Sequence, residues 1–140
     1  MIIIDSSVII DSSVIIAYAN PRDASHERAR KLLADVENGV YGESAITELI
    51  YSEVLTVIFI KMKNHELANT YGEKLPATYN TLFLGEDGLR TAFEIFREQK
   101  GTSLSFVDCS TLALARLNGA SHIATFDKDF RKAEDVEIVS

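Results

Sequence analysis

The stretch IIDSSVIIDSSVII, residues 3–16, contains the motif IIDSSVII twice, at residues 3–10 and 9–16. Each copy has the pattern of a buried β-strand of isoleucine and valine that ends in an acid. Continuous apolar strands of this kind are typical of parallel sheets with helices on both faces, which bind their ligands beyond the carboxyl ends of the strands. The stretch therefore indicates an α/β fold with an acid, either Asp5 or Asp11, at the ligand-binding edge.

The repeat alone leaves the choice between Asp5 and Asp11 open. Shifting the strand by one repeat preserves its buried face, because strand side chains alternate with a period of two. The same shift turns a helix by about 240°, so the two acids cannot share one helical face. In one interpretation MIII is the strand and Asp5 is its terminal acid. In the other, the strand ends at Ile10 and Asp11 follows it.

Helical and extended segments alternate along the rest of the chain. Apolar residues at helical spacing predict helices, which end at Asn-Pro, Asn-Gly and Lys-Gly pairs. Strands separated by helices predict a parallel sheet covered on both faces. The expected helices cover residues 12–19, 25–36, 47–63, 66–74, 87–99 and 105–117, and the expected strands lie within 1–10 and near 40–46, 81–84, 122–126 and 136–139.

Length and composition predict one domain over residues 1–140 with a real hydrophobic core. The hydrophobic share of 46% and the charged share of 25% are ordinary for a globular protein. Asp5 interrupts the first apolar run well short of the roughly 18 residues that a membrane span needs. The single Cys109 cannot form an internal disulfide, so we expect a reduced, cytoplasmic setting without membrane association.

The net charge of −7 argues against a protein that holds nucleic acid by broad neutralisation of phosphates. It does not exclude an enzyme that meets phosphates through divalent cations, because such ions invert the local charge. The placement of the acids therefore decides between a catalytic site and a solvated surface.

Glu53 lies on an apolar helical face in the segment TELIYSEVLTVIFIK, with Leu49 and Ile50 before it and Val57 after it. An unpaired carboxylate on a buried face is costly, so it must pair, take up a proton or bind a cation. Glu48 is a weaker candidate, because an acid at a helix start already interacts favourably with the helix dipole.

Two further acids have both a structural and a functional interpretation. Ser105 and Asp108 have the spacing of a capping box, yet Asp108 also shares a mostly apolar helical face with Leu112. Asp127 follows the apolar strand HIATF. It is either a residue that forms a turn or caps a helix, or a ligand at the edge of the sheet. No basic residue in these segments is placed to neutralise the acids. Clusters of carboxylates suit Mg²⁺ or Mn²⁺, which activate water for phosphodiester hydrolysis.

Three segments resemble the PIN-domain nucleases, most of all their VapC-type toxin branch. They are IIDSSVIIAYANPRDASHERA near the start, ITELIYSEVLTVI in the middle and SFVDCSTLALARLNGASHIATFDKDF near the end. The resemblance covers nearly the whole chain. It implies a three-layer α/β/α sandwich with a central parallel sheet of about five strands. It also implies RNA cleavage that depends on Mg²⁺ or Mn²⁺, a homodimer, and a cognate antitoxin protein that covers the site.

Carried over to this chain, the resemblance implies a catalytic and metal-binding set of Asp11, Glu53, Asp108 and Asp127. The first three would hold the principal ion, and Asp127 would help a second ion or the attacking water. Ser12 and Thr125 would be hydroxyl supports. The family's first acid lies about ten residues before an Asn-Pro-like break, and Asp11, not Asp5, has this spacing from Asn20-Pro21.

Two other classes remain alternatives. A receiver-type domain that accepts a phosphoryl group also uses strand-end acids and Mg²⁺, but it needs two adjacent acids after the first strand, where this chain has Ser-Ser. A non-catalytic PIN-like binding module would keep the fold without cleavage. The wide apolar stripe of residues 47–60 is either a buried central helix or a surface for dimerisation or for the antitoxin.

Overall fold

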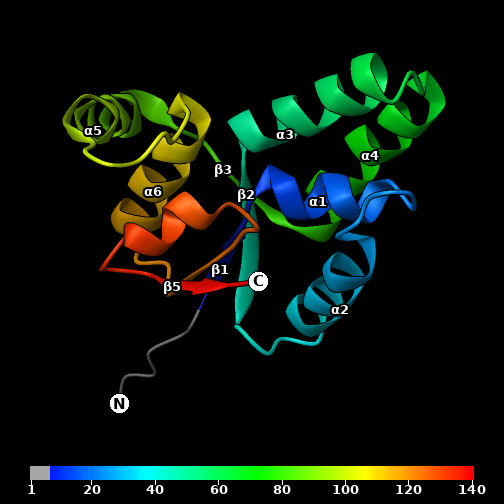
Figure 1. Ribbon diagram of the computed structural model, residues 1–140, viewed down its shortest axis with the longest axis horizontal. Helices are drawn as coiled ribbons and strands as arrows, with labels where there is room; N and C mark the ends of the chain where they lie inside the picture. Colours follow the sequence, from blue (N-terminus) through cyan, green and yellow to red (C-terminus); the bar gives the residue numbers. More distant parts are fainter. Residues whose placement is uncertain (1–6) are drawn as a thin grey trace.

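The computed structural model describes residues 7–140, which form a five-stranded sheet between helices (Figure 1). The strands run parallel to their neighbours in the order β3-β2-β1-β4-β5. Their bounds are β1 (Ser7–Ile10), β2 (Glu43–Thr47), β3 (Asn80–Leu82), β4 (His122–Ala124) and β5 (Glu137–Val139). The central strand β1 ends at Ile10, so Asp11 is the acid that follows it, while Asp5 lies outside the described residues.

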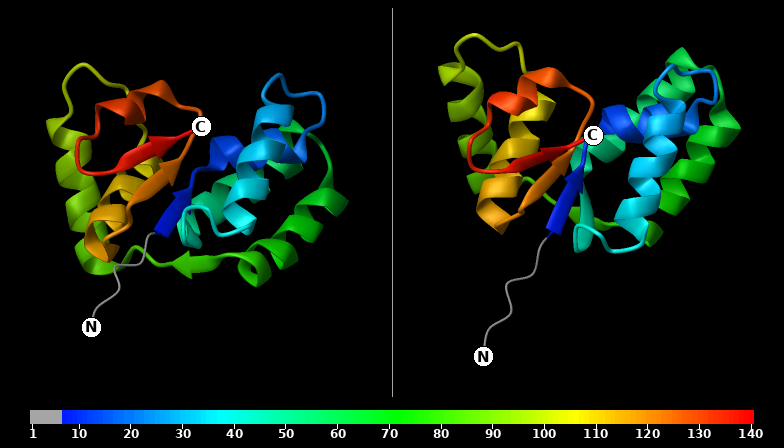
Figure 2. Two further views of the ribbon diagram at one scale, coloured as in Figure 1. Left: turned by 90° about the horizontal axis from the view of Figure 1, so that it is seen from below. Right: turned by 60° about the horizontal axis from the view of Figure 1, so that its bottom comes forward.

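Helices cover both faces of the sheet. The pair α5 and α6 lies on one side, and α1 and α2 lie on the other (Figure 2). The helices are α1 (Ser12–Ala19), α2 (His26–Glu37), α3 (Glu48–Thr56), α4 (His65–Thr78), α5 (Gly85–Glu98) and α6 (Phe106–Asn118), with a π-helical turn η1 (Val57–Lys61) after α3 and a 3₁₀ turn η2 (Lys128–Lys132) after β4. The predicted α/β/α sandwich is confirmed.

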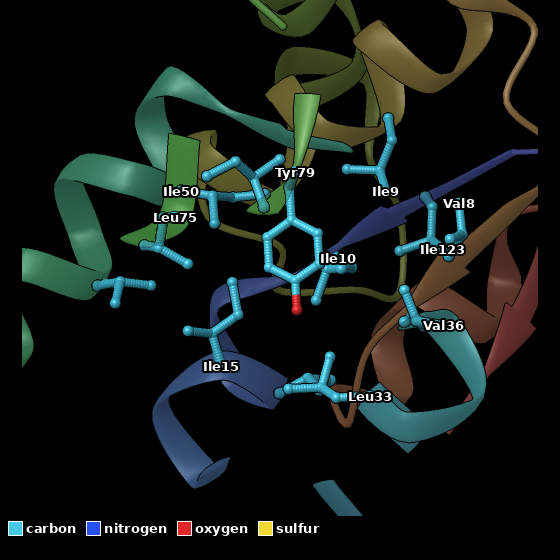
Figure 3. Packing of buried hydrophobic residues seen from close by; sticks show 14 of the residues in the cluster. Val8, Ile9, Ile10, Ile15, Leu33, Val36, Ile50, Leu75, Tyr79 and Ile123 are labelled. Carbon is cyan, nitrogen blue, oxygen red and sulfur yellow. The ribbon is translucent and has the colours of Figure 1, made fainter. Parts of the chain in front are cut away.

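The core on the α1–α2 side of the sheet joins β1 to α1, to α2 and to the end of α4. Ile15 of α1 and Leu33 of α2 are buried beside Ile10 of β1. The ring of Tyr79, which directly follows α4, lies between Ile10 and Ile15 (Figure 3). Because both faces of β1 are covered, its isoleucines and valine are all buried, which explains the continuous apolar run that first indicated a parallel sheet.

Helix α4 continues to Thr78, past the predicted end at Lys74, although it contains Pro76. Proline has no N–H, so Pro76 leaves the carbonyl of Gly72 without its helical hydrogen bond. The hydroxyl of Tyr51 in α3 donates to that carbonyl over 2.9 Å. A neighbouring helix therefore satisfies the freed group, and the helix tolerates the proline.

The parallel arrangement brings the carboxyl ends of the strands to one edge. Ile10 of β1 pairs with Ala124 of β4, and the N–H of Asp11 donates to the carbonyl of Ala124 over 2.9 Å. Asp11 and Thr125 therefore leave the sheet side by side. Among residues 7–140, every helix falls short of the length and hydrophobicity that a membrane crossing demands.

Candidate active site

Asp11 is buried at the end of β1, with 2% of its surface exposed. Its Oδ2 atom accepts two short hydrogen bonds, each of 2.7 Å, from the hydroxyls of Thr125 and Ser13. Its Oδ1 atom is buried and has no hydrogen-bond partner among the described residues. Buried polar atoms are nearly always paired, so this carboxylate oxygen indicates a position for a ligand that carries positive charge or donates a proton.

The hydroxyls around Asp11 differ in one respect from the prediction. Thr125 contacts Asp11 as expected, but the hydroxyl from α1 belongs to Ser13 and not to Ser12. The hydroxyl of Ser13 also accepts a hydrogen bond of 3.1 Å from the N–H of Phe126, which follows Thr125. This contact across the sheet selects Ser13, and the sequence Ser-Ser contains no signal for it.

Asp108 lies half-buried in the first turn of α6, where the predicted capping box is present. The Ser105 hydroxyl accepts from the N–H of Asp108 over 3.1 Å, and Oδ2 of Asp108 accepts from the N–H of Ser105 over 2.9 Å. The structural and functional interpretations of Asp108 are therefore compatible, because the cap fixes the carboxylate at the helix start.

Asp127 caps the turn η2 and faces the same edge. Its Oδ1 atom accepts from the N–H of Asp129 over 2.9 Å, and its own N–H donates to the Thr125 hydroxyl over 3.0 Å. The Thr125 hydroxyl thus contacts both Asp11 and the backbone of Asp127. Asp127 therefore has the turn role that its sequence position predicts, and the Thr125 hydroxyl also connects it to Asp11.

Glu53 and Glu48 have different surroundings on α3. Glu53 is half-buried on the same helix as the buried Ile50 and Val54, as its spacing predicts. The carboxylate of Glu48 accepts a hydrogen bond of 2.8 Å from the N–H of Leu84, just before α5. Glu48 therefore joins two elements of the fold, and Glu53 is the acid of α3 whose charge acts on Asp11.

The four acids influence each other electrostatically. Burial raises the pKa of Asp11, and the charge of Glu53 raises it further, against the opposing hydrogen bonds from Thr125 and Ser13. Burial also raises the pKa of Asp108, and the charges of Asp11 and Asp127 add to this effect. Among residues 7–140, none of the four acids belongs to a salt bridge. Negative charge is therefore concentrated without a basic side chain to balance it.

This donor set fits a hard divalent cation in chemistry, although the side chains do not form a complete cage. Within residues 7–140, no three His, Cys, Asp or Glu side chains are close enough together to hold a metal ion by themselves. Mg²⁺ commonly keeps several waters and takes only one or two carboxylates from the protein. Among residues 7–140, the unpaired oxygen of Asp11 is the clearest candidate for a ligand atom.

A family model described as the PIN domain matches residues 8–136. The chain therefore belongs to the PIN-domain family, and the resemblance noted in the sequence is confirmed. The order of its strands also differs from the order 2-1-3-4-5 of receiver-type domains, which removes the support for that alternative.

Solved structures of VapC-type toxins have the same fold. VapC20 of Mycobacterium tuberculosis, a toxin that cleaves the sarcin-ricin loop, is 24% identical with a TM-score of 0.79, over 93% of this chain and 97% of that one. A toxin–antitoxin complex from Klebsiella pneumoniae is 20% identical with a TM-score of 0.69, over 95% of this chain and 96% of that one. VapBC2 of Rickettsia felis, solved with a DNA fragment from its promoter, is 16% identical with a TM-score of 0.70, over 95% of this chain and 97% of that one. A comparison with curated protein sequences finds no match.

Proposed function

We propose that residues 1–140 act as a single PIN-like nuclease domain, a cytoplasmic endoribonuclease that depends on Mg²⁺ or Mn²⁺ and is the toxin of a toxin–antitoxin pair. The observation that carries this proposal is the buried Oδ1 atom of Asp11, which has no hydrogen-bond partner among residues 7–140. The charges of Glu53 on Asp11, and of Asp11 and Asp127 on Asp108, add to it. Family membership and the toxins of the same fold support the class of reaction.

Each acid has a distinct role in the proposed hydrolysis. Thr125 and Ser13 hold one oxygen of Asp11, so the other is presented in a fixed direction. Glu53 and Asp108 supply further carboxylates from α3 and α6, and Asp127 orients the attacking water. A divalent cation bound there would lower the pKa of that water and stabilise charge on the phosphoryl oxygens.

A basic side chain near this edge supports RNA as the substrate. The guanidinium of Arg28 in α2 lies 4.5 Å from the ring centre of Phe126, the residue between Thr125 and Asp127. Among residues 7–140, Arg28 belongs to no salt bridge. An exposed, unpaired arginine stacked on an aromatic ring is well suited to contact a phosphate or a base of single-stranded RNA.

The substitution Asp108→Asn is expected to lower RNA cleavage by about a hundredfold or more, because it removes a carboxylate ligand worth several kcal/mol in the transition state. Asparagine keeps an oxygen that can accept from the N–H of Ser105, so the helix cap and the fold are retained. Cleavage of single-stranded and structured RNA with Mn²⁺ or Mg²⁺ measures the effect, and growth upon expression measures toxicity.

The control is Ser105→Ala, which removes the capping hydroxyl but keeps the backbone N–H that donates to Oδ2 of Asp108 and so holds its carboxylate. We expect it to cost about 1 kcal/mol of stability and to retain cleavage within a few-fold. Wild-type protein that binds Mn²⁺ but cleaves no RNA would favour the non-catalytic binding module. Equal activity and toxicity of wild type and Asp108→Asn would contradict the proposed role of Asp108.

We propose two protein partners, a second copy of the chain and an antitoxin that covers the acids. An exposed apolar surface supports a partner. On α5, Leu89, Phe93 and Phe96 are 54%, 50% and 43% exposed at helical spacing. In the predicted stripe of residues 47–60, Ile50, Val54 and Ile58 are buried, and the large apolar residues Phe59 and Ile60 at its end are exposed. Contiguous apolar surface of this kind marks protein interfaces.

If the α5 surface forms the dimer, Phe93→Glu is expected to convert a dimer into a monomer, because a charge would be buried at the interface. Light scattering coupled to gel filtration gives the mass of both proteins. The matched control is Leu117→Glu, which places the same charge at a similarly exposed apolar residue of α6. A dimer that survives Phe93→Glu but not Leu117→Glu would place the interface elsewhere.

A further inference from the structure

Asp129 connects two segments of the chain that each hold one of the candidate acids. Its own N–H donates to Oδ1 of Asp127 over 2.9 Å, in the turn after β4. Its Oδ2 atom accepts a hydrogen bond of 2.9 Å from the N–H of Ser103, in the segment between α5 and α6. One residue therefore contacts both the turn that carries Asp127 and the segment that leads into α6.

The segment before α6 transmits this contact to Asp108. Ser103 is two residues from Ser105, which forms the reciprocal cap with Asp108. The intervening Leu104 is buried, and its backbone N–H and C=O both bond to the side chain of Gln99 over 2.9 Å. Because the segment is fixed at these points, a displacement of Ser103 would move the helix start that carries the carboxylate.

A series of hydrogen bonds continues to the first acid. Asp127 donates through its N–H to the Thr125 hydroxyl, which donates to Oδ2 of Asp11. The acids joined in this way carry like charges that repel each other, so their separation has to be imposed by the surrounding structure. Two side chains of the turn η2 bond to the segment before α6: Asp129 accepts from the N–H of Ser103, and Lys132 donates to the carbonyl of Gly101. Asp129 is the one of the two that also contacts Asp127.

We propose that Asp129 is a positioning residue that fixes the separation of Asp108 and Asp127, and so sets the affinity of this edge for a divalent cation. The inference rests on the proposed function only for the identity of the ligand. Residues that orient metal-binding side chains typically contribute 10- to 100-fold in metal affinity or activity. A purely structural contact in the loop would change stability without changing cation affinity.

The test compares Mn²⁺ binding by isothermal titration calorimetry for the full-length wild type, Asp129→Ala, Asp129→Asn and Asp135→Ala. Asparagine retains an oxygen for the N–H of Ser103, whereas alanine does not. Asp135→Ala is the charge-matched control, because it removes one negative charge as Asp129→Ala does. Asp135 forms an ion pair with Arg116 at the surface, with 2.6 Å between the two side chains. We expect the Kd to rise about tenfold or more for Asp129→Ala, to stay within about threefold for Asp129→Asn, and to remain unchanged for Asp135→Ala.

In RNA cleavage, kcat is expected to fall in Asp129→Ala with little change in KM. Three results would overturn the inference: wild-type affinity in Asp129→Ala, equal weakening in the alanine and asparagine variants, or the same loss in Asp135→Ala. Asp129→Ser, whose side chain is too short to replace the bond, takes the place of an alanine variant that fails to fold. Wild type that binds Mn²⁺ without cleaving RNA would refute the proposed function while leaving the role of Asp129 testable, and wild type that binds no Mn²⁺ would overturn both.

Discussion

The substitution Asp11→Asn is expected to abolish RNA cleavage and to raise the melting temperature of the metal-free protein at neutral pH. The asparagine oxygen can accept from Thr125 and Ser13 as Oδ2 does, and its amide nitrogen takes the position of the unpaired Oδ1. The change removes a buried charge that the neighbouring acids repel. Loss of several kcal/mol in the transition state corresponds to about a hundredfold or more in rate.

Cleavage assays with Mn²⁺ and thermal unfolding in the presence of a chelator measure the two effects. One kcal/mol of stability corresponds to roughly 3–5 °C in a chain of this size. Asp35→Asn is the control, because it removes the same charge from an exposed position on α2. A variant that is less stable than wild type and still cleaves RNA would show that Asp11 is a structural residue.

The choice between Asp11 and Asp5 shows which features of the first strand can be predicted from the sequence. The repeat is compatible with two registers, because a strand has a period of two, and only the distance to Asn20-Pro21 favoured Asp11. In the structure, β1 ends at Ile10 and α1 begins at Ser12, so the first acid occupies the junction between them. Periodicity and turn residues predict such elements well, because they are local properties of the chain.

Contacts between distant segments account for what the sequence did not predict. Ser13 was missed in favour of Ser12 because the N–H of Phe126, far away in the sequence, selects one hydroxyl of the pair. The continuation of α4 through Pro76 depends on Tyr51 in another helix. Glu48 looked like a helix-dipole acid, and its bond to Leu84 could not be read from either segment. Each contact joins segments that lie far apart in the sequence, and spacing along the chain does not encode such contacts.

The candidate site depends both on local sequence patterns and on contacts between distant segments. The four acids were predicted because each departs from a local pattern, as an acid after an apolar strand or on an apolar helical face, and the family resemblance selected Asp11 over Asp5. Their separations depend on how α3, α6 and the turn after β4 approach β1. The incomplete cage and the bonds of Asp129 are consequences of that approach, and neither has a signature in the sequence.

The metal-free protein is expected to lose stability as pH rises, and a divalent cation is expected to restore it. Asp11 and Asp108 have folded-state pKa values above the ordinary value of 3.8, mainly because both are buried. Between 3.8 and those raised values the native state binds more protons than the unfolded state, so the free energy of unfolding falls as pH rises through this window. Above the raised values, the full cost of the buried charge remains.

A cation bound to the charged carboxylates reverses this trend. Mn²⁺ at about a hundred times its Kd adds about 2.7 kcal/mol to the free energy of unfolding. The gain is expected to be larger near pH 8 than near pH 5, because protons compete for the same oxygens at the lower pH. Urea unfolding of wild type and Asp11→Asn across this range, with Mn²⁺ or with a chelator, isolates the contribution of Asp11. If the difference between the two proteins in chelator is independent of pH, then Asp11 does not have a raised pKa in the folded protein. If Mn²⁺ stabilises both proteins equally, then the buried oxygen of Asp11 does not bind the cation.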